Sequence, residues 1–385
     1  MDESKDEIRA NFENVEAQLQ SFHNPQKMGG FAVAVFDADT TFYVNGFGYA
    51  DLENGIPYTV NTEQYVASIA KTTIGIALLK AQELGLLKVE DPINQYLPFE
   101  VKNPKFPSSP ITIRHLSTHT SSLDYNEAVV ESLYVEEELK RESLASFMDD
   151  YFNSGTVKYS HRAPGEDWNY SNIGASLAAY IIELQSDMSF SAFTQQYIFD
   201  PLRIENTTWF ESHSDSNQWT TYYEIKEKKL RKVKTSGVQL YPSRDMITNV
   251  QDLTTYCQAI IAQDQRLLSK ASFATLLAPS LSSKVSNQSV DNHGLFFMID
   301  RNQYGITYQL TGMNGGDNCI NTMMWFDPVT EIGYIFIGNT GQVESNRVAH
   351  IWIYRTLVSL GDHVTLEQSM KYKWHNIFSR LRAVF

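Results

Sequence analysis

The first regular pattern of hydrophobic and polar positions along the chain has the spacing of a helix. Apolar residues recur every three or four positions between residues 6 and 22, which predicts an amphipathic helix. These residues are Ile8, Phe12, Val15, Leu19 and Phe22. Two stretches rich in apolar and aromatic residues, 31–36 and 41–50, follow on either side of a short polar turn. Their pattern predicts a β-hairpin.

The next predicted element is an apolar helix. It begins near Ser68 and ends at Gly85, because glycine readily adopts the left-handed conformation that follows a helix. Between residues 86 and 225 helical and irregular patterns prevail, and strand signals are scarce. Strand patterns return late in the chain, at 305–311, 320–327 and 332–338. The pattern over 347–360 then predicts a helix that covers the sheet.

Strands near both ends of the sequence with helices between them predict an α/β fold in which a helical domain interrupts a sheet domain. We assign the sheet domain to residues 1–65 and 235–360 and the mainly helical domain to 66–234. The apolar spacing in 361–385 predicts a separate C-terminal amphipathic helix. We expect it to dock on the body of the protein, and an oligomer contact or a membrane-surface contact through 364–385 is the alternative.

The composition narrows the class of protein. Hydrophobic residues make up 42% of the 385 residues and charged residues 20%, as is usual for a globular protein. The net charge of −14 argues against a nucleic-acid partner, because binding to phosphates needs a basic surface. No apolar stretch has the length of a transmembrane segment. The acidic start lacks the hydrophobic core of a signal peptide, so we expect either an intracellular protein or one whose signal has been removed.

Candidate chemistry is found at the head of the apolar helix. Ser68 and Lys71 are three positions apart, so they share one helix face. A serine at a helix N-terminus lies near unpaired backbone N–H groups and the positive end of the helix dipole. This setting suits the oxyanion that forms when a serine attacks a carbonyl, and a buried lysine would help to remove the serine proton. A helix cap with an unreactive lysine is the alternative explanation of the pair.

Two further segments carry residues of matching chemistry. Tyr170 and Asn172 follow a Pro-Gly turn at 164–165 and lead into a helical pattern. A tyrosine near Ser68 would serve as a general base or proton shuttle, and the asparagine would orient the lysine or a substrate amide. The glycine-dense segment 310–328 would let a backbone edge approach a ligand closely. Taken alone, a glycine-rich hairpin turn is the simpler explanation of that segment.

Together these segments resemble the serine β-lactamase and penicillin-binding protein superfamily, and in particular its class C β-lactamase-like branch, which includes esterases and D-amino-acid peptidases or amidases. The similarity extends from about residue 20 to residue 345. The stretch "GFGYADLENGIPYTVNTEQYVASIAKT" looks like the family's segment leading to the nucleophile, and "ITIRHLSTHTSSL" is similar to its "ITIRHLLTHTSGL". The resemblance implies a β-lactamase/transpeptidase-like fold, with an antiparallel sheet flanked by helices and an inserted all-helical domain.

The resemblance also implies a role for each matching residue. Ser68 would be the acylated nucleophile, Lys71 its activating partner and Tyr170 the general base or acid. Asn172 would be a polar neighbour of the lysine and the substrate. The family's third motif would place four more residues at the substrate or the oxyanion, namely Met313, Asn314, Gly315 and Gly316. The backbone N–H groups of Ser68 and Gly316 would form the oxyanion hole. Which group accepts the serine proton stays open.

The sequence departs from the family's pattern at two places. Met313 stands where relatives that hydrolyse β-lactams usually have lysine and many others have histidine. Methionine neither binds a carboxylate nor carries a proton, so this departure argues against β-lactamase and carboxypeptidase activity. Arg244 and Asp245 occupy positions where relatives tend to have small residues. Arg244 is a candidate for binding a substrate carboxylate, although surface arginines are common.

We therefore expect a serine hydrolase that works through an acyl-enzyme without a metal or cofactor. His115 and His119 lack the glutamate of a zinc-binding helix between them, so we assign them no metal. The expected substrate is a small molecule or peptide with an ester or amide bond, D-amino-acid and β-lactam-like compounds included. A β-lactamase is the alternative within enzymes. A binding or regulatory protein with little or no catalysis is the alternative from another class, because Met313 replaces a functional side chain. The family's habit favours a periplasmic or secreted location over a cytoplasmic one.

Overall fold

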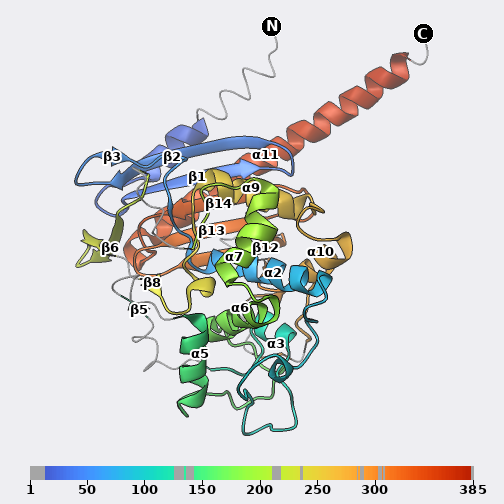
Figure 1. Ribbon diagram of the computed structural model, residues 1–385. Coiled ribbons are helices and arrows are strands. Elements are labelled where there is room, and N and C mark those ends of the chain that lie inside the picture. The colour runs from blue at the N-terminus through green and yellow to red at the C-terminus, as the bar shows by residue number, and fades with distance from the viewer. Residues whose placement is uncertain are drawn as a thin grey trace.

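The computed structural model of the chain describes most of its residues. These are 14–124, 134–135, 143–209, 218–234, 237–283, 285–286, 290–301, 306 and 308–382. At their centre is an eight-stranded sheet in which neighbouring strands are antiparallel (Figure 1). In sheet order the strands are β10 (Asn292–His293), β11 (Met298–Asp300), β12 (Leu310–Gly316), β13 (Asn321–Phe326), β14 (Gly333–Gly338), β1 (Gly30–Phe36), β2 (Thr41–Asp51) and β3 (Ile56–Pro57).

The first long strand, β1, lies inside this sheet. β1 pairs with β14 on one side and with β2 on the other, so segments near the two ends of the sequence lie side by side. Every residue of β1 is buried. Its alternate side chains join two hydrophobic clusters on opposite faces of the sheet. One set is Ala32, Ala34 and Phe36, and the other is Phe31, Val33 and Val35.

One face of the sheet carries the two terminal helices. They are α11 (Glu344–Arg382) and a helix over residues 14–22. Leu19 of the N-terminal helix and Ile353 of α11 are fully buried in the cluster on this face, which explains the apolar spacing of both segments.

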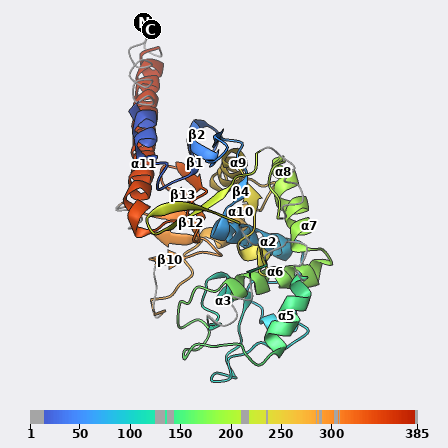
Figure 2. The ribbon, with the colours of Figure 1, turned by 90° about the vertical axis from the view of Figure 1, so that its left-hand side faces the viewer.

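The C-terminal helix differs from the expectation in two ways. A single helix, α11, replaces the two that we predicted at 347–360 and 361–385, and it passes through Gly361 without a break. A Cβ at Gly361 would lie 2.6 Å from Tyr334 Oη, so the glycine allows close packing of the helix on the sheet. Both views show the C-terminal part of α11 extending away from the sheet (Figures 1 and 2). Val364, near the start of this part, is buried in the same cluster as Ile353, and the docking that we expected for the residues after it stays a prediction.

The opposite face of the sheet carries the remaining helices (Figure 2). The α-helices are α2 (Lys71–Glu83), α3 (Ile113–Ser117), α5 (Leu144–Asn153), α6 (Asn172–Ser186), α7 (Phe190–Thr194), α8 (Asp200–Leu202), α9 (Val250–Ile261) and α10 (Lys270–Leu277). The short non-α turns of helix are η1 (Ala67–Ala70), η2 (Ile93–Gln95), η4 (Gln195–Phe199) and η6 (Tyr241–Ser243). Three small strand pairs complete the fold: β4 (Gln64–Tyr65) with β9 (Ile247–Thr248), β5 (Tyr134–Val135) with β8 (Gly237–Val238), and β6 (Tyr222–Lys226) with β7 (Lys229–Val233).

Helix α2 is the core of this helical part. Ten of its residues are buried, including Lys71 and Gly75, because other elements surround it. A Cβ at Gly75 would lie 2.3 Å from the carbonyl oxygen of Leu295, so glycine permits the close approach of that segment. The helix ends as predicted, with Gly85 in the left-handed conformation at φ +76°. Among the described residues, no helix has both the length and the apolar character that crossing a membrane requires.

The predicted fold class is confirmed, with an antiparallel sheet, flanking helices and a helical insertion. The strands of the main sheet fall within the predicted ranges 1–65 and 235–360, and the division into domains stays a prediction. The strand that we predicted at 305–311 is displaced, because β12 runs through the glycine-dense segment as far as Gly316. Pairing with β13 as far as Gly316, and with β11 at Gly312, holds these glycines extended despite their low strand propensity.

Candidate active site

Ser68 lies in the short turn η1, directly before helix α2. Its side chain is partly exposed, while both neighbours are buried. Ala67 has φ +49°, a left-handed conformation that costs a non-glycine residue about 1–3 kcal/mol and that is common at functional sites. The strained residue turns the chain sharply from β4 into the helix, so the serine hydroxyl faces outward at the helix N-terminus.

Lys71 is fully buried one helical turn after the serine. Its Nζ lies 3.0 Å from Ser68 Oγ and donates a 2.7 Å hydrogen bond to the carbonyl oxygen of Ser243. Burial, together with the positive charge of Arg244, holds the pKa of Lys71 well below its ordinary value. A neutral amine is therefore accessible next to the serine hydroxyl.

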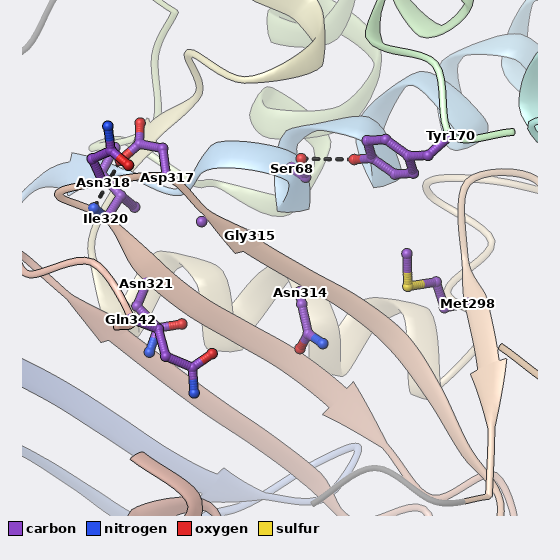
Figure 3. Close-up of a pocket in the computed structure, with 11 residues that line it drawn as sticks. Ser68, Tyr170, Met298, Asn314, Gly315, Asp317, Asn318, Ile320, Asn321 and Gln342 are labelled. Carbon is purple, nitrogen blue, oxygen red and sulfur yellow. Dashed lines mark hydrogen bonds between the residues drawn. The ribbon is translucent and has the colours of Figure 1, made fainter. Parts of the chain in front are cut away.

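Tyr170 approaches the same serine from the loop before α6. Its hydroxyl donates a 2.7 Å hydrogen bond to Ser68 Oγ, and the two side chains point toward one another (Figure 3). Burial raises the pKa of Tyr170, and the hydrogen bond to Ser68 offsets part of that rise. The phenol is consequently protonated at neutral pH and can act as a proton donor. Lys71 Nζ lies 5.0 Å from the centre of the tyrosine ring.

The segment 111–123, which resembles "ITIRHLLTHTSGL", packs against the ring of Tyr170. The imidazole of His119 is fully buried, with its centre 4.4 Å from that of the Tyr170 ring. Its Nδ1 accepts a hydrogen bond from the backbone N–H of Ser171, and burial keeps the pKa of His119 well below its ordinary value. His115 Nδ1 instead accepts from the backbone N–H of Thr112 and caps α3. Both histidines thus accept hydrogen bonds from backbone N–H groups. Among the described residues, no cluster of His, Cys, Asp and Glu side chains could bind a metal.

Strand β12 passes close to the serine at Gly315. A Cβ at this position would lie 2.3 Å from the carbonyl oxygen of Val66 and 3.0 Å from the backbone nitrogen of Ser68. Only glycine lets the strand approach the nucleophile this closely. Thr322 on the neighbouring strand β13 donates a 2.8 Å hydrogen bond to the same Val66 carbonyl, which ties the turn before α2 to the sheet.

A cavity of about 520 Å³ opens beside the serine. Its walls come from η1, the loop before α6, strands β11 to β13 with the turn between β12 and β13, and the segment before α11 (Figure 3). The lining residues are Ser68, Tyr170, Met298, Asn314, Gly315, Gly316, Asp317, Asn318, Ile320, Asn321 and Gln342. Four of these side chains are neutral amides, and the one charged side chain among them is the carboxylate of Asp317.

The structure brings together most, but not all, of the predicted site residues. Asn314 lines the cavity, and its Oδ1 accepts a 2.7 Å hydrogen bond from Trp325. Met313 is fully buried and does not line the cavity, so its predicted place at the substrate is wrong. Asn172 is exposed at the first position of α6. Its predicted contact with Lys71 is wrong, because the backbone carbonyl of Ser243 takes that position.

Sequence reasoning also missed the surroundings of Arg244. Its guanidinium pairs with Asp245 and Asp317 rather than lining the cavity. The idea that it binds a substrate carboxylate is therefore not supported, since two carboxylates of the protein already occupy it. The unusual Arg-Asp dipeptide was the only signal in the sequence, and its partner Asp317 lies 73 positions away.

Comparisons with known proteins identify relatives of the chain. A sequence model of the family described as Beta-lactamase matches residues 12–356. PbpX of Bacillus subtilis, named as a penicillin-binding protein, is 26% identical over 310 residues, which is 76% of this chain and 74% of that protein. For other curated relatives the matched part is 41–46% of their length, so the chain spans less than half of them.

Solved structures show the same fold at low sequence identity. The octameric penicillin-binding protein homologue from Pyrococcus abyssi has a TM-score of 0.74 at 22% identity, over 94% of this chain and 78% of that one. The D-amino acid amidase from Ochrobactrum anthropi has a TM-score of 0.68 at 19% identity, over 90% of this chain and 99% of that one.

Proposed function

The chain belongs to the beta-lactamase family of serine hydrolases, and we propose that it cleaves a neutral ester or amide through an acyl-enzyme on Ser68. The observation that carries the proposal is the convergence of two proton-carrying side chains on one hydroxyl. Lys71 Nζ and Tyr170 Oη lie 3.0 and 2.7 Å from Ser68 Oγ. A nucleophile with two such neighbours at a helix N-terminus is what acyl transfer requires.

The unequal proton affinities of these two neighbours support different roles for them. Lys71, whose pKa is lowered, accepts the proton of Ser68 as Oγ attacks the carbonyl carbon. The carbonyl oxygen becomes an anion, and the backbone N–H groups of Ser68 and Gly316 stabilise it. Tyr170, whose pKa is raised, gives its proton to the leaving group as the bond to that group breaks. The lysine proton then replaces the one that the tyrosine gave up. Water attacks the resulting ester and releases the acid with the proton transfers reversed.

The cavity supports an uncharged substrate. Among the described residues that line it there is no lysine, arginine or histidine, and Asp317 would repel a substrate carboxylate. Asn314 and the other amide side chains offer hydrogen bonds to neutral carbonyl and amine groups instead. β-Lactams and peptides with a free C-terminal carboxylate fit such a wall poorly. Amides of D-amino acids, for which one solved neighbour is named, have no carboxylate and belong in the test panel.

The proposal is tested with the purified protein and Ser68→Ala. Labelling by a fluorophosphonate probe, intact-mass detection of an adduct and turnover of p-nitrophenyl esters are measured for both proteins. Nitrocefin and D-amino acid p-nitroanilides complete the substrate panel. We expect an adduct and turnover in the wild type and neither in the variant. Ser108→Ala is the control, because Ser108 is exposed and lies outside the cavity lining.

Two results would overturn the assignment. Hydrolysis that persists in Ser68→Ala would show that another residue is the nucleophile. A folded wild type that forms no adduct with any compound would favour a binding or regulatory protein, for which the buried, uncharged Met313 is the motivating observation.

A further inference from the structure

Arg244 lies between two parts of the site that are distant in sequence. It directly follows Ser243, whose carbonyl oxygen holds Lys71 at 2.7 Å. Its own Nη1 donates a 2.9 Å hydrogen bond to Asp245, and its Nη2 donates to Asp317. The side chain of Arg244 is only 13% exposed. One guanidinium therefore connects the segment that anchors the lysine with the turn between β12 and β13.

Asp317 shapes that turn directly after Gly316. Its Oδ1 accepts hydrogen bonds from the backbone N–H groups of Cys319 and Ile320, at 2.8 and 2.9 Å. Its own backbone N–H donates to the carbonyl oxygen of Ile320 at 2.9 Å. The second carboxylate oxygen binds Arg244. The conformation of the turn, and with it the end of the strand that passes Ser68, thus depends on a carboxylate that the arginine holds.

The other partners of Arg244 are equally well fixed. Asp245 is fully buried, and its Oδ2 accepts a 2.7 Å hydrogen bond from the backbone N–H of Val238. The guanidinium carbon of Arg244 lies 5.7 Å from the ring centre of Tyr65, which precedes the nucleophile by three positions. A planar guanidinium that binds two carboxylates and lies over an aromatic ring cannot be replaced by the single ammonium group of a lysine.

We propose that Arg244 is a positioning residue that clamps the Lys71 anchor to the β12–β13 turn and thereby holds the lysine and the oxyanion-binding edge in register. This inference rests on the proposed function of Ser68. It assigns to Arg244 a role other than the binding of a substrate carboxylate that the sequence suggested. Loss of the clamp would let the Gly316 edge and the Lys71 amine move independently, and small displacements of reacting groups cost much of the rate.

The clamp also has an electrostatic consequence for Lys71. The groups that face this lysine are Arg244, Tyr170 and His119, from three different segments. After burial, the charge of Arg244 is the remaining cause that lowers the pKa of Lys71. Removing that charge, while both aspartates stay, raises the proton affinity of the lysine. The neutral, reactive amine then appears only at higher pH.

The test compares kcat/KM of a p-nitrophenyl ester from pH 5 to 10 in the full-length wild type and in variants at both ends of the clamp. For Arg244→Gln we expect the acid limb to move toward alkaline pH, so that kcat/KM on that limb falls, and we expect the plateau to fall at least tenfold. For Arg244→Lys we expect the limb to move less, because the charge is kept, while the plateau falls similarly. For Asp317→Asn we expect a lower plateau without a shift toward alkaline pH, because the arginine charge remains.

Arg266→Gln is the matched control. Arg266 also pairs with a neighbouring aspartate, Asp264, but it is more than half exposed and does not line the cavity. We expect its profile to coincide with that of the wild type. Thermal unfolding of each variant is measured alongside, and the double variant Arg244→Gln with Asp317→Asn should lose less than the product of the two single losses.

Several outcomes would overturn the clamp. If Arg244→Gln unfolds more easily but keeps the wild-type pH profile and plateau, the arginine has only a structural role. If Arg244→Gln does not fold, a full plateau in Arg244→Lys refutes the clamp by itself. Failure of the proposed function is recognised separately, because the wild type would then show no Ser68-dependent fluorophosphonate labelling.

Discussion

Replacing Gly315 with alanine should disable the site by pushing two backbone segments apart. The new Cβ would lie 2.3 Å from the carbonyl oxygen of Val66, whereas ordinary contacts of a Cβ begin at 3.4 Å. The segment before Ser68 would have to retreat from β12 by about 1 Å. The hydrogen bond from Thr322 to the carbonyl of Val66 holds this segment against the sheet. The segment therefore cannot move away from β12 without loss of that hydrogen bond.

The magnitude follows from the size of this displacement. A misplacement of about 1 Å between a nucleophile and its stabilising groups costs about 10²-fold in rate, or about 2.7 kcal/mol of transition-state stabilisation. Forcing an extra methyl group into a packed site costs about 1–3 kcal/mol of folding free energy. We therefore expect Gly315→Ala to lose about 10²-fold in the rate of acylation and to unfold a few degrees earlier.

Gly316→Ala provides the matched comparison. Its Cβ would meet only the carbonyl oxygen of Ile320, at 3.3 Å, and its backbone N–H is kept. The acylation rate is measured by intact mass against time with a p-nitrophenyl ester, and the melting temperature by circular dichroism. We expect a far smaller loss for Gly316→Ala than for Gly315→Ala. Equal acylation rates in the two variants would refute the reasoning from close approach.

Two further predictions concern the buried Lys71 and the methionine at position 313. Burial and Arg244 lower the pKa of Lys71 below its ordinary 10.5. Between these two pKa values the unfolded wild type binds a proton that the folded protein has released. The stability of the wild type relative to Lys71→Met should therefore rise with pH up to about 10.5. Wild-type kcat/KM should also rise with pH as the neutral amine appears, while Lys71→Met has no turnover. Stability is measured by urea unfolding at pH 6 and pH 9.5. A difference in stability between the wild type and Lys71→Met that is the same at both pH values would contradict this prediction. Met313→Lys should lower the melting temperature markedly without producing nitrocefin hydrolysis, because the new amine would lie fully buried outside the cavity lining. A gain of nitrocefin hydrolysis would show that this position does face the substrate.

Local patterns predicted those parts of the protein whose geometry depends on neighbouring residues. The apolar stretch 31–36 predicted a strand, and β1 indeed divides its side chains between two faces of the sheet. The stop at Gly85 was predictable because its left-handed backbone is a property of that residue type. The contact between Ser68 and Lys71 was predictable for the same reason, since three positions along a helix always return to the same face.

Other features of the site depend on packing between distant segments, and no local pattern records them. The exposed position of Asn172 and the burial of Met313 depend on how α6 and β12 settle against their neighbours. A backbone carbonyl, that of Ser243, holds the lysine in place of the predicted asparagine, and every residue type supplies such a carbonyl. Arg244 and Asp317 meet across 73 positions. The sequence by itself therefore determined the elements and the chemical groups available, and the tertiary structure decided which of those groups meet, because long-range contacts follow from the packing of whole elements.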